Sequence, residues 1–291
     1  METPRWIIGC GYVGQRLAAA ELAAGRRVAA CVTSHDKARQ LIGQGLDCHR
    51  LNLDTAEHAP DFDCLDAVVH YHVPPTPEGE QDQRMRTFLR LLERAGRPQR
   101  LVYLSTTGVY GDTGGAWVDE NSPVNPQTSR ARRRLDAEQQ LTAWCRHHGS
   151  RLVILRVPGI YGPGRTALAR LGNPVIQPHE APYSNRIHVD DLVSACQRAA
   201  DSSDPLPLYN VSDDQPSTMT DYFYATADHA GIARPTAISM AQAKTRLSAA
   251  MLSYLGESRR VDNRRMREHL GVVLRFPNLA SGLADCFGKA S

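Results

Sequence analysis

The chain of 291 residues is 42% hydrophobic and 22% charged, and its 34 basic and 31 acidic residues give a formal net charge of +3. This length holds one large α/β domain with an appendage or two small domains, and the composition is that of a globular protein. So balanced a charge argues against a nucleic-acid partner, and the lack of an 18-residue apolar run argues against a membrane span. No signal-peptide pattern opens the sequence, so we expect a cytoplasmic protein. A monomer or a homodimer is expected.

Seven cysteines are scattered along the chain, and none belongs to a C-x-x-C pair. An odd number of cysteines at such spacings predicts neither a disulfide framework nor a zinc site. We therefore expect reduced thiols and no bound metal ion.

The predicted elements alternate between short apolar runs and segments rich in helix formers. Strands are predicted over residues 5–8, 27–33, 66–71, 100–105, 151–157 and 207–211, with a further short apolar run at 48–53. Helices are predicted over residues 15–22, 37–43, 81–95, 129–148, 190–200, 239–255 and 263–270. This alternation predicts an α/β fold with a doubly wound parallel sheet of the Rossmann type, covered by helices on both faces.

The pattern loosens after residue 157, where prolines become frequent and the sequence becomes more polar. We expect a dinucleotide-binding domain made of residues 1–160 and 187–212. Residues 161–186 and 213–291 are expected to form a smaller, interleaved domain that caps the substrate site at the ligand-binding edge of the sheet.

The first predicted strand runs into a glycine-rich turn that opens a helix, Gly9-Cys10-Gly11-Tyr12-Val13-Gly14. In this context the spacing G-x-G-x-x-G indicates dinucleotide binding. Gly9 makes the tight turn, Gly11 lets the backbone approach a pyrophosphate, and Gly14 lets helix and strand pack closely. The free amides and partial positive charge of the helix N-terminus would hold the phosphates.

The end of the second predicted strand indicates which coenzyme is bound. NAD-binding proteins usually carry an acidic residue there, which accepts a hydrogen bond from the ribose 2′-hydroxyl. In this chain Thr33 and Ser34 occupy that place, and Asp36 lies beyond it as a candidate helix cap. Thr33 and Ser34, with Lys37 and Arg39, form a candidate site for a 2′-phosphate, so we expect NADP(H), with NAD(H) as the alternative.

Four later stretches carry further signatures: LVYLSTTGVYGD at 101–112, LRVPGIYGPG at 155–164, NRIHVDDL at 185–192 and YNV at 209–211. They resemble, in order, the S-[ST]-x-x-V-Y-G, R-x-x-x-[IV]-Y-G-P and I-H-V-x-D-L elements and the final strand of the extended short-chain dehydrogenase/reductase superfamily. This superfamily, also described as the NAD-dependent epimerase/dehydratase family, includes nucleotide-sugar epimerases and dehydratases. The chain is most similar to its atypical YeeZ-like branch.

The resemblance implies the positions of further site residues. Thr106 corresponds to the catalytic Ser/Thr of the superfamily. The cofactor contacts that it implies are Asn52 and Leu53 at the adenine, Tyr71, His72 and Val73 where a strand passes under the cofactor, Ser105 beside the catalytic position, and Pro158, Gly159 and Ile160 at the nicotinamide.

The helix predicted over 129–148 begins with four arginines in five positions. In the superfamily this helix carries Tyr-x-x-x-Lys, and the tyrosine moves the substrate hydroxyl proton during hydride transfer. Alignment on Glu138 places Arg130 at the tyrosine position and Arg134 at the lysine position. No tyrosine or lysine occurs between residues 111 and 160, so no small shift in alignment restores the pair.

This substitution changes the available chemistry, because a guanidinium stays protonated near neutral pH. Arg130 can polarise a carbonyl or bind a phosphate, but it cannot act as the general base. His72, His188 and Asp112 are the candidate replacements. Arg132 and Arg133 are expected on the solvated side of the helix, and the cluster is too short to predict nucleic-acid binding.

Two other departures from the superfamily's motifs narrow the range of expected substrates. Thr107-Gly108 stands where dehydratases of the superfamily carry Asp-Glu, and Ser184 stands where nucleotide-sugar epimerases often carry an arginine. We expect an NAD(P)-dependent oxidoreductase or epimerase-like enzyme with an altered active site, acting on a small polar substrate. The resemblance implies a sugar derivative as one class of such substrates. The alternative is a non-catalytic NAD(P)-binding sensor or regulatory subunit.

Overall fold

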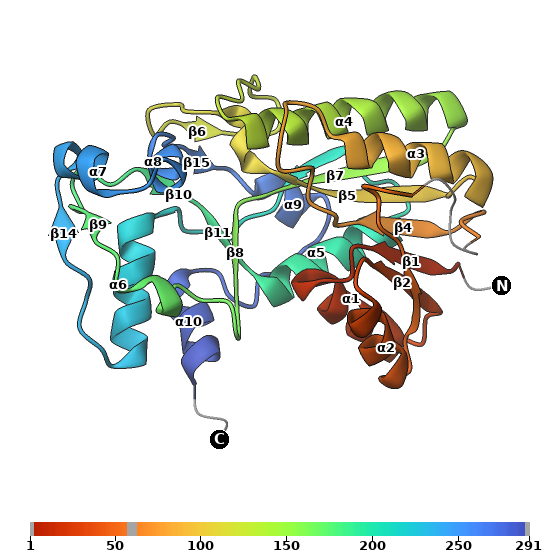
Figure 1. Ribbon diagram of the computed structural model, residues 1–291, viewed down its shortest axis with the longest axis horizontal. Coiled ribbons are helices and arrows are strands. Elements are labelled where there is room, and N and C mark those ends of the chain that lie inside the picture. Colours follow the sequence, from red (N-terminus) through yellow and green to blue (C-terminus); the bar gives the residue numbers. More distant parts are fainter. Residues whose placement is uncertain (1–2, 57–62, 289–291) are drawn as a thin grey trace.

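The computed structural model describes residues 3–56 and 63–288, and at its centre lies a seven-stranded sheet (Figure 1). The strand order is β12-β7-β5-β4-β1-β2-β3, and every neighbouring pair is parallel. The strands are β1 (Arg5–Ile8), β2 (Val28–Val32), β3 (Asp47–Arg50), β4 (Val68–Tyr71), β5 (Arg100–Thr106), β7 (Arg151–Val157) and β12 (Leu208–Asn210). The predicted doubly wound parallel sheet is confirmed. Because the strand order reverses between β1 and β4, the carboxyl ends of these two strands mark the expected ligand crevice.

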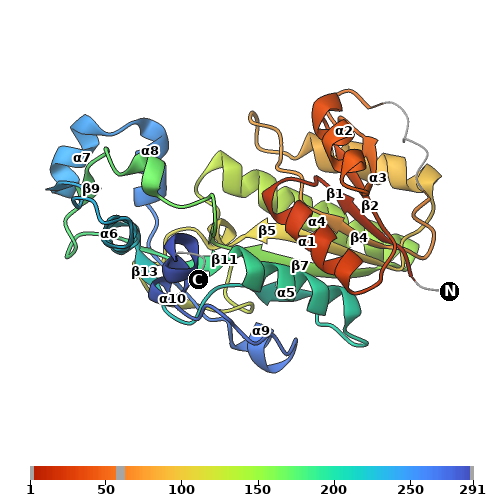
Figure 2. The same ribbon diagram turned by 90° about the horizontal axis from the view of Figure 1, so that it is seen from below.

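Helices cover both faces of this sheet (Figures 1 and 2). One face carries α1 (Tyr12–Ala23), α2 (His35–Gly43) and α5 (Val189–Asp201), and the other carries α3 (Gln83–Ala95) and α4 (Ser129–His148). Because successive strand side chains point to opposite faces, a strand between two helical layers must be apolar at nearly every position. Strand β1 shows the alternation, since Ile7 packs with the α1–α5 layer and Ile8 with the α3–α4 layer.

Most of the C-terminal part of the chain lies beyond the carboxyl ends of the sheet strands, on the left of Figure 1, whereas α9 (Arg264–Glu268) packs beside β12. It has apolar clusters of its own, one of which contains Tyr161, Phe223 and Leu283. Its elements, with the short ones that connect it to the sheet, are β8 (Gly159–Tyr161), β9 (Val175–Ile176), β10 (Tyr183–Ser184), β11 (Arg186–His188), β13 (Ser217–Thr218), α6 (Met219–Ala230), β14 (Ala237–Ile238), α7 (Met240–Arg246), α8 (Ala249–Leu255), β15 (Arg260–Val261), α9 (Arg264–Glu268) and α10 (Leu279–Phe287). The remaining short elements are the 3₁₀ turns η1 (Thr107–Tyr110) and η2 (Leu168–Arg170) and the strand β6 (Trp117–Val118).

One predicted helix is wrong, because residues 239–255 form the two helices α7 and α8. The break occurs at Leu247, whose ψ of 152° is extended, and at Ser248, whose side chain accepts a hydrogen bond from the amide of Met251 at 3.2 Å. A serine that caps a new helix in this way competes with continuation of the preceding one. The helices α6 and α10 were not predicted, although a capping box formed by Thr218 and Asp221 opens α6.

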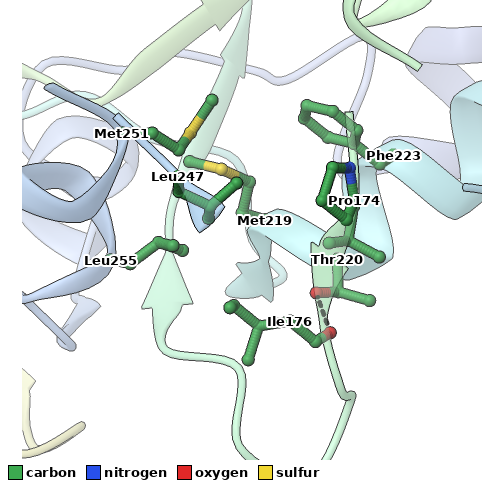
Figure 3. A pocket seen from close by; sticks show the side chains of 9 residues that line it. Pro174, Ile176, Met219, Thr220, Phe223, Leu247, Met251 and Leu255 are labelled. Atoms are coloured by element: carbon green, nitrogen blue, oxygen red, sulfur yellow. Dashed lines mark hydrogen bonds between the residues drawn. The ribbon is translucent and has the colours of Figure 1, made fainter. Parts of the chain in front are cut away.

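A small apolar cavity lies within the C-terminal part. Figure 3 shows Met219, Leu247, Met251 and Leu255 around it. Its volume of about 10 Å³ has room for roughly one water molecule, so it is a gap in packing and not a ligand site. None of the described helices is both long enough and apolar enough to cross a lipid bilayer.

Candidate functional site

The glycine-rich loop connects β1 to α1 at the predicted crevice. Gly9 has a φ of +94°, and a Cβ there would lie 2.9 Å from the backbone nitrogen of Val73. A Cβ on Gly14 would lie 3.0 Å from the Gly9 carbonyl oxygen, whereas one on Gly11 would meet nothing within 4 Å. Gly9 and Gly14 are therefore required by close packing, and Gly11 leaves the outer side of the loop open to a ligand.

The N-terminus of α1 presents free amides behind this open position. Gly11 is the N-cap and supplies no side-chain cap, and the first turn contains no acidic residue. Within the described part of the chain, the amides of Tyr12, Val13 and Gly14 find no hydrogen-bond partner. Such amides, together with the helix dipole, form an anion-binding site. Cys10 contributes differently, because its amide donates to the Cys31 carbonyl at 3.0 Å and its side chain is buried.

Tyr12 connects the loop to the segment that follows β8. Its hydroxyl donates to the carbonyl of Pro163 at 3.0 Å, and the Arg16 guanidinium lies 4.0 Å from its ring centroid. The Arg165 guanidinium lies 5.3 Å from the centroid of the same ring. The side chain of Tyr12 therefore stabilises the contact between the loop and the C-terminal part of the chain.

The end of β2 carries no acidic residue. The strand ends at Val32, Thr33 follows it, and Ser34 is the N-cap of α2, with its hydroxyl accepting from the Lys37 amide at 3.4 Å. Asp36 lies in the first turn of α2 and forms an exposed ion pair with Arg39 at 2.5 Å. No carboxylate of this segment is thus available at the strand end for a ribose 2′-hydroxyl.

Two basic side chains that the sequence reasoning missed lie at this place. Arg50 ends β3 directly beside Val32 in the sheet register. Its Nε donates to the Thr33 carbonyl at 3.2 Å, and its Nη1 lies 2.8 Å from Nε2 of His35. The parallel pairing of β2 with β3 could have revealed Arg50, because the last residues of neighbouring parallel strands lie together.

The residues expected near adenine and under the cofactor have different surroundings. The Asn52 side chain accepts from the Asp54 amide at 3.1 Å, and Leu53 is buried. Tyr71 points away from the loop into the core, where its ring lies 4.7 Å from that of Phe88. His72 and Val73 follow β4, and Val73 packs against Gly9 as described above.

Several of the later signature residues form one buried network. Ser105 donates to the carboxylate of Glu138, which also accepts from Arg156 at 3.1 and 2.7 Å. The Arg156 guanidinium lies 4.8 Å from the ring centroid of Tyr110, whose hydroxyl donates to the Asn210 side chain at 2.7 Å. The network joins β5, α4, β7, η1 and β12, so these residues hold the carboxyl edge of the sheet together.

Thr106 and Arg134 lie at this same edge. The Thr106 hydroxyl oxygen accepts from the Gly108 amide at 3.1 Å. Arg134 donates through Nη1 to the Leu104 carbonyl at 2.9 Å and to the Tyr103 hydroxyl at 3.3 Å, so its guanidinium lies against the end of β5.

Arg130 extends from α4 to the C-terminal part of the chain. Its Nη1 donates to the Ser253 hydroxyl at 2.6 Å, and its guanidinium lies 3.9 Å from the ring centroid of Tyr254. Arg132 pairs with Glu80 at 2.8 Å, and Arg133 is buried and donates to the Gly79 carbonyl. Arg133 is thus not on the solvated side where the helix pattern predicted it.

The segment expected at the nicotinamide lies beside a buried arginine. Pro158 precedes β8, which contains Gly159 and Ile160 and pairs in parallel with β11. A Cβ on Gly159 would lie 2.8 Å from Nη1 of Arg186, and the Arg186 guanidinium lies 4.7 Å from the ring centroid of Tyr222.

The three candidate bases have distinct environments. Asp112 accepts from the Ser258 amide at 2.8 Å, which ties the loop after η1 to the C-terminal part. His188 is the N-cap of α5, with Nδ1 accepting from the Asp190 amide at 3.3 Å. Burial, followed by the charge of Arg134, lowers the pKa of His72 to about 3, so its imidazole is neutral and weakly basic.

Residues 7–212 match the sequence model of the NAD dependent epimerase/dehydratase family. The chain belongs to this family. Protein YeeZ of Escherichia coli (strain K12) is 25% identical over 281 residues, which cover 94% of this chain and 96% of that protein.

Two solved structures have a similar fold. A functionally unknown conserved protein from Silicibacter pomeroyi DSS superposes with a TM-score of 0.82 at 30% identity, over 98% of both chains. MoeE5 in complex with UDP-glucose and NAD superposes with a TM-score of 0.74 at 22% identity, over 98% of this chain and 97% of that one. At that lower identity the second likeness shows the fold alone.

Proposed function

We propose that this family member binds NADP(H) at the loop between β1 and α1 and transfers hydride to or from a small polar, sugar-derived substrate. The observation that carries the proposal is the group of unpaired amides at Tyr12, Val13 and Gly14 behind the open side of Gly11. Residues 1–160 and 187–212 would bind the dinucleotide, and residues 161–186 and 213–291 would cap the substrate. MoeE5, whose complex holds UDP-glucose and NAD, supports this choice of substrate class.

The loop fits a pyrophosphate because it offers donors and no competing carboxylate. Three free amides and the dipole of a 12-residue helix face a space that no side chain fills. When bound, the nicotinamide ring would supply the hydride donor or acceptor. Pro158, Gly159 and Ile160 would lie beside that ring.

The adenosine side of the site favours a 2′-phosphate. Arg50 and His35 lie together at the end of β2, next to Thr33 and Ser34. A guanidinium binds phosphate through charge-assisted hydrogen bonds, whereas a ribose hydroxyl gives it little to bind. We therefore infer that Arg50, with Thr33 and Ser34, selects NADP(H) over NAD(H).

Thr106 and Arg134 would act on the substrate at the carboxyl edge of β5. The Thr106 oxygen already accepts a bond from the Gly108 amide, so its hydroxyl proton remains available for a substrate oxygen. Arg134 remains cationic and would stabilise negative charge that develops on that oxygen, without taking a proton.

Arg130 would fix the cap over the site. Its bonds to Ser253 and Tyr254 join the helix that carries the family's catalytic pair to α8. Since a guanidinium cannot accept a proton near neutral pH, Arg130 would orient the substrate or the cap, and the substrate hydroxyl proton would pass to another group.

Coenzyme binding is tested by calorimetry of purified protein with NADP+ and NAD+. We expect NADP+ to bind more tightly than NAD+. Arg50→Ala should weaken NADP+ binding by roughly 10- to 100-fold, the value of a lost charge-assisted hydrogen bond, and leave NAD+ binding unchanged. Arg234→Ala is the matched control, because Arg234 is exposed, paired with Asp228 and lies in the C-terminal part of the chain. Failure to bind either coenzyme would overturn the proposal.

Gly11→Ala tests the open side of the loop. The backbone at Gly11 has a φ of −88° and a ψ of −143°, a combination outside the regions that L-residues favour, and the added methyl meets no atom of the protein within 4 Å. We expect a modest loss of thermal stability in the free protein and a loss of coenzyme affinity, because the methyl occupies the pyrophosphate space. An unchanged affinity would place the coenzyme elsewhere.

Turnover is tested with a panel of carbonyl compounds and sugar nucleotides, following the coenzyme absorbance. Thr106→Val and Arg134→Met should each reduce turnover while coenzyme affinity is retained. Equal activity of both variants and the wild type would remove these two roles.

A second candidate function, a non-catalytic NADP(H) sensor, is favoured by the bonds of Arg130 to α8. In that case NADP+ binding would change hydrogen exchange in Ala249–Leu255 and no substrate would be converted. Detectable hydride exchange with any substrate excludes this candidate.

A further inference from the structure

Two histidines and a cysteine meet beneath the glycine-rich loop. His70 belongs to β4 and His72 follows that strand, so their side chains point to the same face of the sheet. This face is covered by α5, which carries Cys196. The ligand-capable atoms of the three side chains all lie within 4.8 Å of one another.

The histidines have unsatisfied hydrogen-bonding groups. His70 and Cys196 are completely buried, and neither ring nitrogen of His70 or of His72 has a hydrogen-bond partner within the described part of the chain. A neutral imidazole has one donor and one acceptor, and leaving both unpaired away from water is unfavourable. Four such nitrogens in one place indicate that a bound group completes the site.

The donor types suit metal coordination. Each neutral imidazole offers one nitrogen lone pair, and metal binding deprotonates a thiol.

Charged groups lie at both ends of the cluster. The buried carboxylate of Glu21 interacts electrostatically with Cys196. Arg5 and Arg26, which pair with Glu21 at 3.4 and 2.8 Å, interact electrostatically with His70. The charge of Arg134 also reaches His72, so these three arginines oppose a bound cation. A thiolate ligand is therefore needed to make the site favourable for a metal ion.

We propose that His70, His72 and Cys196 form a binding site for a thiophilic transition-metal ion, with Zn²⁺ as the ion that best matches the donors. Imidazole nitrogen and thiolate sulfur are the ligands that zinc prefers, whereas Mg²⁺ and Ca²⁺ prefer oxygen. On binding, the Cys196 S–H bond breaks, its proton goes to solvent, and a metal–sulfur bond forms beside two metal–nitrogen bonds. The ion keeps its +2 charge.

The geometry requires a modest contraction. Zinc bonds of about 2.0–2.1 Å to nitrogen and 2.3 Å to sulfur separate tetrahedral ligands by roughly 3.4–3.6 Å. Donor atoms up to 4.8 Å apart reach this separation by small side-chain rotations. Three protein ligands leave the fourth position for a water molecule.

The site would be a binding site separate from the nucleotide cradle, although the two adjoin. A Cβ on Gly9 would lie 3.1 Å from the carbonyl carbon of His72, so the glycine-rich loop rests on the backbone that carries this ligand. Metal binding can be measured without any coenzyme, so its failure and the failure of the proposed function are distinguishable.

The test is a Zn²⁺ titration of chelator-treated, full-length protein in competition with a chromophoric chelator, followed by Co²⁺ substitution. We expect one Zn²⁺ per chain and, with Co²⁺, the absorbance of a thiolate-to-cobalt transition. Cys196→Ser should abolish that absorbance and weaken Zn²⁺ binding by at least about 100-fold. His70→Asn and His72→Asn should weaken Zn²⁺ binding similarly. Cys64→Ser and His229→Ala are controls, a buried cysteine and an exposed histidine outside the cluster, and should bind as the wild type does.

Thermal melts of the wild type and the cysteine variants provide a second test that does not depend on the histidine variants folding. Zn²⁺ should raise the melting temperature of the wild type and of Cys64→Ser but not that of Cys196→Ser, because a ligand that binds only the native state stabilises it. Wild-type protein that binds no Zn²⁺, or binding that survives Cys196→Ser undiminished, would overturn the proposal.

Discussion

The buried ion pair between Glu138 and Arg156 offers the most quantitative prediction. Its side chains are 5% and 7% exposed, and the carboxylate also accepts a hydrogen bond from Ser105. Glu138→Gln keeps the size of the side chain and an acceptor for Ser105 but removes the negative charge. The Arg156 guanidinium then remains buried without a counter-charge.

Breaking a buried pair by removing one partner costs about 3–5 kcal/mol. The glutamine oxygen can still accept one bond from Arg156, so we expect the lower end, a loss of about 3 kcal/mol in the free energy of unfolding. This loss corresponds to roughly a 100-fold increase in the unfolding equilibrium constant, since about 1.4 kcal/mol is a factor of ten.

The chain contains a matched control in the pair Asp228–Arg234. It has the same two-point geometry, at 2.8 and 2.6 Å, but its side chains are 47% and 56% exposed. Asp228→Asn should therefore leave the free energy of unfolding nearly unchanged.

Urea unfolding followed by circular dichroism compares the two variants directly. The double variant Glu138→Leu with Arg156→Met should recover much of the lost stability, because it removes the unpaired charge as well. Equal losses for Glu138→Gln and Asp228→Asn, within about 0.5 kcal/mol, would refute the reasoning that burial sets the cost.

Three further outcomes follow from the structure. Gly111→Ala should destabilise the protein by about 3 kcal/mol or more in urea unfolding, because its Cβ would lie 2.0 Å from the Asn125 carbonyl oxygen. Gly114 has a similar φ of +61° and nothing within 4 Å of its Cβ position, so Gly114→Ala should cost only about 1–2 kcal/mol. Equal losses would contradict the steric argument. Arg130→Ala should speed amide exchange in Ala249–Leu255 and leave Tyr12–Ala23 unchanged, as measured by mass spectrometry, since the bonds to α8 are lost; unaltered exchange in α8 would count against the clamp. Burial raises the pKa of Asp213 to about 8, so the folded state holds a proton that the unfolded state releases, and the stability gained by Asp213→Asn should grow between about pH 4 and pH 8; a gain independent of pH in thermal melts would reject this protonation.

The candidate site shows how far spacing along the chain can be used. Gly9, Gly11 and Gly14 were assigned separate roles from one six-residue motif. In the structure Gly9 and Gly14 are closely packed, and Gly11 faces open space. The absence of an acid at the end of β2 was likewise visible, because the strand ends next to Thr33 as expected. Arg50 was missed, since its place beside β2 depends on which strands pair.

The longer signatures were read correctly as family marks, and their contacts became visible only in three dimensions. Ser105, Glu138 and Arg156 lie far apart in sequence and form one buried network, so part of what the motifs encode is packing of the sheet edge. The cluster of His70, His72 and Cys196 is a similar case. A count of cysteines and their spacings predicts no metal ligands, because α5 brings Cys196 to β4 from 126 positions away along the chain, by the residue numbers 196 and 70.

The sequence by itself determined the parallel sheet, the glycine-rich loop and the presence of Arg130 and Arg134 one turn apart on one helix. These features depend on local patterns, namely apolar runs, glycines at fixed spacing and residue types on one helix. The tertiary structure decided where the two arginines reach, with Arg134 on the end of β5 and Arg130 on α8. A long, flexible side chain takes its direction from the partners that surround it, and those partners come from segments that only folding brings together.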